Sequence, residues 1–201
     1  DTTYDGRVLT CAHVPQADSI WYAYFEPYSH ERHQDLVARG QAGGAALVDL
    51  GTSVEGRDLD LLRFGSDDAN RRKIWIVARQ HPGETMAEWF CEGLIERLLD
   101  TADPVARRVR EIATVYIVPN INPDGAIRGN LRTNAAGANL NREWAAPSLA
   151  RSPEVLHTLD AMRKAGCDLF LDIHGDESLP WVFADGCSML PGFTPEQAVR
   201  E

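Results

Sequence analysis

The stretch KIWIVARQHPGETMAEWF, residues 73–90, changes from one structural pattern to another within a few residues. Residues 74–78 are all apolar, which is typical of a short strand buried on both faces of a sheet. From residue 84 to residue 100 the apolar side chains recur at helical spacing instead. His81 and Glu84 lie at the junction, on either side of a Pro-Gly pair. The stretch therefore predicts a buried strand that turns at once into a helix, with two candidate metal ligands at the turn.

The same alternation of strands and helices continues on both sides of this stretch. Further helices are expected at 104–110 and 152–166, and further strands at ATVYIV and CDLFLDI. AALVDLG and LDLLRFG, separated by the turn-forming SVEGRD, are expected to pair as a hairpin at one edge of the sheet. This order predicts an α/β fold, a three-layer sandwich with a mixed, largely parallel sheet. Ligands bind such sheets at the carboxyl ends of the strands.

The two ends of the chain have other patterns. The aromatic-rich segments RVLTCAHV and SIWYAYFEPY, within residues 7–28, predict short strands and the end of a β-rich module. A short helix is expected at 29–40, after an N-capping Ser29, and QAGGA is expected to be a linker. Near the C-terminus, WVFADG is expected to form a short strand and TPEQAVRE the beginning of a helix.

Composition excludes some classes of function. The chain of 201 residues has a net charge of −10 and its longest basic run is Arg71-Arg72-Lys73, so a nucleic-acid partner is not expected. No apolar run approaches the roughly 20 residues of a membrane span, so no membrane association is expected. The four cysteines are far apart and form no CxxC pair. They are interpreted as reduced thiols, which favours a cytoplasmic location.

A third candidate ligand gives His81 and Glu84 a possible partner. An isolated HxxE pair occurs more often by chance than in a metal site. His174, however, directly follows the predicted strand LFLDI, so it lies where another buried strand opens to solvent. Two imidazoles and one carboxylate form the ligand set of a catalytic zinc ion, with one position left for water. The alternative for His174 is a core histidine that is hydrogen-bonded to the backbone.

The segment between these ligands contains two arginines that could bind substrate. NPDG, residues 122–125, is followed by RGNLRTNAAGANLNREW, residues 128–144, which contains Arg132 and Arg142. A guanidinium group can hold a carboxylate with two hydrogen bonds, and a cation beside a metal can stabilise an oxyanion. Taken alone, the two arginines would more often be solvated surface residues, and NPDG an ordinary turn.

Together, HPGE, NPDG, LRTN, ANLNREW and LDIHGDE resemble the zinc metallocarboxypeptidases of the carboxypeptidase A type, over roughly residues 20–190. The wording of the motifs is most similar to the cytosolic carboxypeptidase branch and its bacterial relatives. The resemblance implies one Zn²⁺ ion and a hydrolase that removes the C-terminal residue of peptides or proteins, with acidic residues such as Glu suggested by this branch.

The resemblance also implies individual roles. His81, Glu84 and His174 would bind the zinc ion. Arg132 would steady the scissile carbonyl and its oxyanion, while Asn141 and Arg142 would bind the C-terminal carboxylate of the substrate. A strained, cis peptide bond is expected around Gly175-Asp176.

The resemblance implies a division of the chain as well. Residues 1–40 would be the end of an N-terminal β-sandwich-like module with its linker, and residues 41–201 the N-terminal part of the catalytic domain. The family needs a general-base glutamate and a tyrosine well after the third ligand. The glutamates after His174 do not fit that place and no tyrosine follows it. We therefore expect a truncated chain that alone binds zinc weakly at most and is inactive.

Two other functions remain open at this stage. One is a zinc amidohydrolase of small N-acyl amino acids, similar to aspartoacylase and succinylglutamate desuccinylase, which share HxxE, a distant histidine and a DLNR-like segment. NPDG and the N-terminal aromatic segment favour the peptidase. The other is a binding module without catalysis, which the missing base would permit.

Overall fold

The computed structural model describes residues 1–201 apart from residues 67, 180, 187–191, 193 and 195–201. Its main feature is a five-stranded sheet with the strand order β3-β4-β6-β5-β7. The strands are β3 (Ala46–Thr52), β4 (Asp58–Phe64), β5 (Arg72–Ala78), β6 (Ala113–Val118) and β7 (Leu169–Ile173). Strand β5 pairs in parallel with β6 and β7, whereas β4 is antiparallel to β3 and β6. Only β4 therefore runs against the other strands, and the predicted mixed, largely parallel sheet with an edge hairpin is confirmed.

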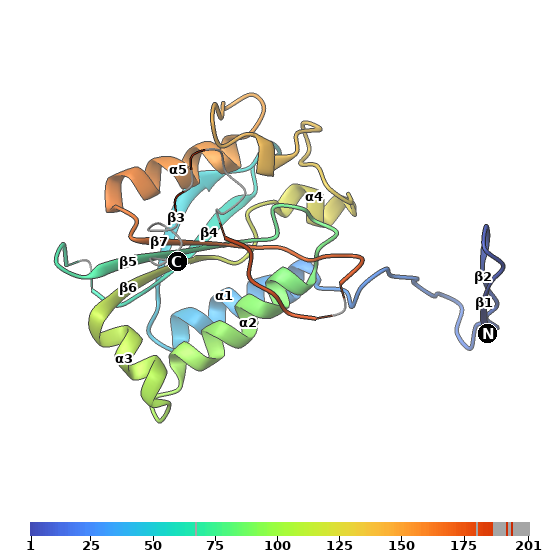
Figure 1. Cartoon of the computed structure of the whole chain (residues 1–201), viewed down its shortest axis with the longest axis horizontal. Helices are drawn as coiled ribbons and strands as arrows, with labels where there is room; N and C mark the ends of the chain where they lie inside the picture. The colour runs from blue at the N-terminus through green and yellow to red at the C-terminus, as the bar shows by residue number, and fades with distance from the viewer. Residues whose placement is uncertain (67, 180, 187–191, 193, 195–201) are drawn as a thin grey trace.

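Helices cover both faces of this sheet, which confirms the three-layer sandwich (Figure 1). One face packs against α1 (His30–Ala42), α2 (Met86–Leu99) and α3 (Pro104–Ile112), and the other against α5 (Pro153–Ala165). Each face of the sheet has its own apolar core, where it packs against the helices. On the α5 side the rings of Trp75 and Tyr116 stack at 4.5 Å. The short helix α4 (Pro123–Arg128) follows β6 at the carboxyl end of the parallel strands.

Local sequence signals explain where these helices begin. Ser29 accepts a hydrogen bond from the backbone N–H of Arg32 at the start of α1. Asp103 accepts two such bonds at the start of α3, and Pro153 occupies the first turn of α5. Ser29 and Asp103 thus satisfy backbone donors that have no partner within the helix, and Pro153 has no N–H that would need a partner. The helices predicted at 29–40, 84–100, 104–110 and 152–166 are all present.

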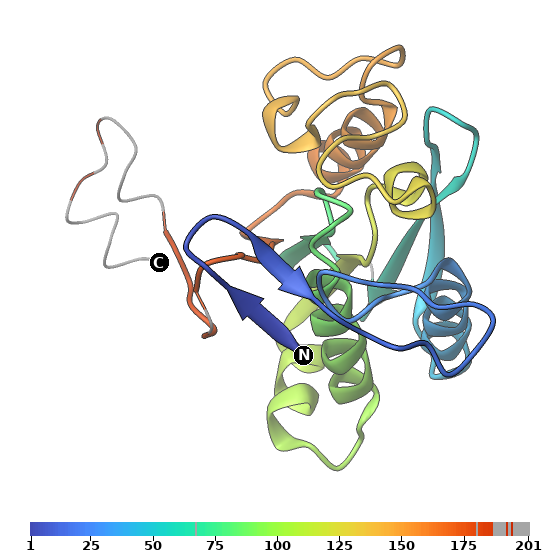
Figure 2. The ribbon, with the colours of Figure 1, turned by 90° about the vertical axis from the view of Figure 1, so that its right-hand side faces the viewer.

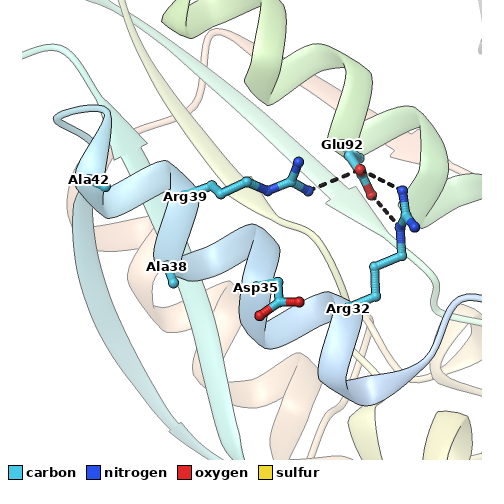
Figure 3. A pocket seen from close by; sticks show the side chains of 6 residues that line it. All are labelled: Arg32, Asp35, Ala38, Arg39, Ala42 and Glu92. Carbon is cyan, nitrogen blue, oxygen red and sulfur yellow. Dashed lines mark hydrogen bonds and ion pairs between the residues drawn. The ribbon is translucent and has the colours of Figure 1, made fainter.

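An ion-pair cluster joins α1 to α2 at the surface hollow drawn in Figure 3. Arg32 donates to both carboxylate oxygens of Glu92, at 2.8 and 2.9 Å, and Arg39 lies 2.9 Å from the same carboxylate. The buried hydroxyl of Tyr28 also donates to it, at 2.7 Å. The hydrogen bonds from Arg32 are the main cause that lowers the pKa of Glu92 to about 2. A permanently ionised Glu92 thus ties α1 and the segment before it to the sandwich.

The N-terminal segment contains one of its two predicted strands, because β2 lies within RVLTCAHV. Strands β1 (Thr2–Tyr4) and β2 (Leu9–Cys11) form a separate antiparallel hairpin that projects from the sandwich (Figures 1 and 2). The strand expected in SIWYAYFEPY is not formed, because none of the strands that the structure describes pairs with it. Its aromatic side chains are mostly exposed, whereas Tyr28 is buried against the sandwich. The division at residue 40 remains a prediction, and α1 itself contributes to the sandwich core.

Two expectations near the C-terminal end were also wrong, and the alternative interpretation of NPDG as an ordinary turn does not hold. Strand β7 is not buried on both faces, since Leu169, Phe170 and Leu171 are each more than a third exposed. Among the described residues it pairs with β5 alone. No strand forms in the described part of 181–186, and NPDG is the start of helix α4 rather than a plain turn. The helix predicted in TPEQAVRE lies almost wholly outside the described residues.

Among the helices that the structure describes, none is long and apolar enough to cross a membrane.

A buried histidine makes the stability of this fold depend on pH. In α1, His33 places Nδ1 2.6 Å from Glu88 and Nε2 3.1 Å from Asp60. Burial alone would lower the pKa of His33, but these two carboxylates outweigh it and raise the pKa to about 9. Because the pKa in the unfolded chain is about 6.5, protonated His33 stabilises the fold fully below pH 6.5. That stabilisation is lost as the pH rises through 9.

We expect wild type to have a larger free energy of unfolding than His33→Gln at low pH. The difference between the two proteins should decrease by up to about 3 kcal/mol as the pH rises from 6.5 to 9. Urea unfolding at a series of pH values measures it. His13→Gln, in the exposed N-terminal segment, is the control and should give a curve parallel to wild type. Parallel curves for His33→Gln would contradict the assignment.

Candidate metal centre

The parallel register of the sheet brings the candidate ligands together. Ala78, the last residue of β5, lies opposite Ile173, the last residue of β7. His174 directly follows β7, and His81 follows β5 by three residues. The two imidazole rings lie 4.8 Å apart between centroids. One ring nitrogen of each imidazole and one carboxylate oxygen of Glu84 all lie within 4.8 Å of one another, as binding to a single metal ion would require.

Glu84 lies between the two imidazoles. Its Oε1 is 2.7 Å from Nδ1 of His81, and its Oε2 is 2.7 Å from Nδ1 of His174. The backbone N–H of Gly175 donates to Oε2 at 3.0 Å. Burial alone would raise the pKa of Glu84, but the hydrogen bonds from His174, His81 and Gly175 outweigh it and lower the pKa to about 2. The carboxylate is therefore ionised, as a metal ligand must be.

The opposite nitrogen of each imidazole faces an acceptor. Nε2 of His81 lies 3.0 Å from Oδ1 of Asn139, and Nε2 of His174 lies 2.9 Å from Oδ2 of Asp172. Metal-binding histidines usually donate their second ring N–H to such an acceptor, which leaves the first nitrogen free for the metal. Both rings therefore present Nδ1 toward Glu84. This set of two Nδ1 atoms and one carboxylate fits a zinc ion.

Burial and carboxylates compete in setting the charge of His174. Burial alone would lower the pKa of its imidazole, but the hydrogen bonds to Asp172 and Glu84 outweigh it and raise the pKa to about 9. The ring is thus held in a strongly negative environment. Such an environment also favours a divalent cation between the same groups.

A buried arginine holds the turn that carries His81 and Glu84. Arg79 has a backbone φ of 59°, unusual for a residue other than glycine. Its guanidinium donates to the carbonyl of Pro82 at 3.1 Å, to that of Tyr28 at 3.0 Å and to Glu88 at 2.5 Å. The N–H of Gly83 donates to the carbonyl of Leu131. These contacts hold the backbone of the turn between β5 and α2 in place.

The predicted substrate-binding residues lie at different distances from the ligands. Nη1 of Arg132 lies 3.0 and 3.1 Å from the two ring nitrogens of His81. Nδ2 of Asn141 lies 3.3 Å from Nε2 of His174. Arg142 is exposed on the short 3₁₀ turn η1 (Leu140–Arg142) and donates to the carbonyl of Asn141. Arg132 and Asn141 are thus in contact with the ligand rings, whereas Arg142 is one residue further along the loop.

Four residues that support the ligands had no predicted role, namely Arg79, Gln80, Asn139 and Asp172. Asn139 and Asp172 each precede a predicted site residue by two positions within quoted motifs, which was the available signal. One prediction about this region was wrong. No peptide bond among the described residues is cis, so the bond around Gly175-Asp176 is trans.

The fold and the His-Glu-His cluster point to the class of zinc carboxypeptidases, and comparison with known proteins agrees. The family model of the zinc carboxypeptidases matches residues 31–185, and the chain belongs to this family. A metallo-carboxypeptidase from Burkholderia cenocepacia is 56% identical, with a TM-score of 0.91 over 99% of this chain.

Two further relatives are informative. A metallo-carboxypeptidase from Pseudomonas aeruginosa, solved in complex with (2-guanidinoethylmercapto)succinic acid, is 55% identical, with a TM-score of 0.80 over 88% of this chain. Cytosolic carboxypeptidase 6 of Mus musculus is 33% identical over 81% of this chain. The chain spans 55% of the Burkholderia chain, 48% of the Pseudomonas chain and 32% of the mouse protein.

A glycine beside the site permits close packing that alanine would prevent. An added Cβ at Gly125, in α4, would lie 2.4 Å from the ring of Pro82 and 2.6 Å from the carbonyl oxygen of Thr133. Pro82 belongs to the ligand turn and Thr133 follows Arg132. We expect Gly125→Ala to lower the free energy of unfolding by about 1–3 kcal/mol, measured by urea denaturation.

The control for this substitution is Gly93→Ala, in the exposed middle of α2, where an added Cβ has no atom within 4 Å. It should raise stability by about 0.5–1 kcal/mol, because alanine favours the helix. An unchanged stability of Gly125→Ala would show that the packing between α4 and the ligand turn is looser than described.

Proposed function

We propose that this protein is a zinc-dependent metallocarboxypeptidase that hydrolyses the C-terminal peptide bond of peptides or proteins. The observation that carries the proposal is the convergence of His81, Glu84 and His174 on one point, with the guanidinium of Arg132 against the ring of His81. A zinc ion bound there would polarise the scissile carbonyl and lower the pKa of an attacking water.

The residues of this chain would divide the remaining work. His81, Glu84 and His174 hold the ion. Arg132, an exposed cation beside the ligands, donates to the carbonyl oxygen as negative charge develops on it. Asn141 and Arg142 bind the C-terminal carboxylate of the substrate, Arg142 through its guanidinium. The proton acceptor for the attacking water is not assigned to any residue described above.

The residue removed from the substrate is a second part of the proposal. The cytosolic branch suggests acidic residues such as Glu. The compound bound to the Pseudomonas relative carries a guanidine group beside its carboxylic acids, and the net charge of −10 also disfavours an acidic substrate. Paired peptides that end in Glu and in Arg therefore belong in every assay.

A cytoplasmic location remains an expectation, supported by the name of the mouse relative and by the unpaired cysteines Cys11, Cys91 and Cys167.

The proposal predicts a specific defect when Arg142 is removed. In the protein at its natural length, Arg142→Ala should lower kcat/KM for peptides with a free C-terminus by roughly 10–100-fold, the loss expected for charge-assisted hydrogen bonds. Bound zinc should stay unchanged. Hydrolysis of the same peptides with an amidated C-terminus, already slow in wild type, should change little.

Arg163→Ala removes an exposed arginine of α5 and is the matched control, with no expected effect. An equal loss on free and amidated peptides would rule out carboxylate binding by Arg142. N-acetylaspartate is included because its hydrolysis, in the absence of peptide hydrolysis, would favour the small-molecule amidohydrolase instead.

A further inference from the structure

Asp172 in β7 supports the metal centre, although no role was predicted for it from the sequence. Its side chain is about one quarter exposed, and its Oδ2 lies 2.9 Å from Nε2 of His174. The same oxygen accepts a second hydrogen bond from Nε2 of Gln80, at 2.7 Å. Gln80 is completely buried and directly precedes His81. One oxygen of Asp172 thus joins His174 to Gln80, the residue before His81. Both histidines are predicted zinc ligands.

The other end of this connection is the loop that carries the predicted substrate-binding residues. The indole Nε1 of Trp144 donates to Oε1 of Gln80 at 2.8 Å. Trp144 lies two residues after Arg142, and its ring also contacts that of Phe170 in β7. A single hydrogen-bonded path therefore runs from Trp144 through Gln80 and Asp172 to His174.

The direction of every hydrogen bond in this path is determined by Trp144. An indole nitrogen can only donate, so the atom of Gln80 that it meets must be the carbonyl oxygen. The amide nitrogen of Gln80 then faces Asp172 and donates to it. An ionised carboxylate can only accept, so Nε2 of His174 must carry the proton that it donates to Asp172.

A nearby amide does not provide an alternative partner. Nδ2 of Asn141 lies 3.3 Å from the same Nε2 atom, but an amide nitrogen is itself a donor. It cannot accept the proton of His174. Asp172 is thus the acceptor that faces Nε2, whereas Nδ1, on the other side of the ring, faces Glu84 and the proposed zinc position.

We propose that Trp144, Gln80 and Asp172 form a directed hydrogen-bond relay that orients the ring of His174, with Nε2 on Asp172 and Nδ1 toward the metal position, so that Asp172 and Gln80 are positioning residues of the metal centre. The inference rests on the proposed zinc site. The relay also couples the substrate-binding loop to a metal ligand, since Trp144 belongs to that loop. Loss of such an outer partner typically lowers metal affinity by about 10–100-fold.

The experiment compares zinc dissociation constants, measured by competition with a chelator on the protein at its natural length. Asp172→Ala removes the acceptor and should weaken zinc binding by about 10–100-fold. Asp172→Asn keeps an oxygen that can accept from both His174 and Gln80, so it should recover most of the affinity. Trp144→Phe keeps an aromatic ring but removes the donor, and should have a smaller effect in the same direction as Asp172→Ala.

The matched control is Asp168→Ala. Asp168 lies just before β7 and accepts a hydrogen bond from the backbone N–H of Lys73, away from the ligands. Its loss can lower stability without changing zinc affinity, which separates a structural effect from a positioning effect.

A second measurement does not depend on zinc. The ¹H–¹⁵N signal of the Nε2–H group of His174 in the zinc-free protein reports whether this nitrogen is hydrogen-bonded. Wild type should show a signal that exchanges slowly with solvent, and Asp172→Ala should lose it to fast exchange. Unchanged zinc affinity and an unchanged Nε2–H signal in Asp172→Ala would overturn the relay. A wild-type protein that binds no zinc but shows the slowly exchanging Nε2–H signal would instead contradict the proposed function and leave the relay standing.

Discussion

The site depends first on the parallel pairing of β5 with both β6 and β7. The register places Val77 opposite Val118 and Ala78 opposite Ile173, so the three strands end at one edge of the sheet. Each chain segment that leaves this edge carries polar residues, and these residues meet although they are distant in the sequence. Glu84 and His174 are 90 residues apart and lie in direct contact. A shift of one residue in this register would turn the side chains of β7 to the opposite face.

Polar groups are buried around this edge in unusual number, and they are paired with one another. Glu88 is completely buried and binds Arg79, while it also faces His33. Burying these charges costs free energy, and the pairing offsets that cost only while every partner is present. Removal of one partner from such a cluster typically costs about 3–5 kcal/mol. The region around the ligands is therefore built for a fixed geometry rather than for maximal stability.

The sequence was sufficient for those elements whose signals are local. Apolar runs and helical spacing predicted the sheet and its helices, and HPGE and DIHGDE indicated the ligands because each follows a strand. The failures arise where partners decide the outcome. SIWYAYFEPY has the composition of a strand, but no strand in the described part of the chain pairs with it. Its last residue, Tyr28, is buried because it packs against the sandwich and donates to Glu92. Gln80 and Asp172 looked like ordinary polar ends of strands, since their contact spans 92 positions and depends on the register.

The two histidines receive different support, and this has a consequence for the chemistry of the site. His81 faces the neutral amide of Asn139, which also accepts the backbone N–H of Asn141 in the turn η1. His174 faces the carboxylate of Asp172. The carboxylate stabilises positive charge on the ring of His174, and such a partner strengthens an imidazole as a metal ligand. Both acceptors are anchored to the segment 139–144 that also carries Asn141 and Arg142. The segment therefore contacts both imidazoles through hydrogen bonds, directly from Asn139 to His81 and through Trp144, Gln80 and Asp172 to His174.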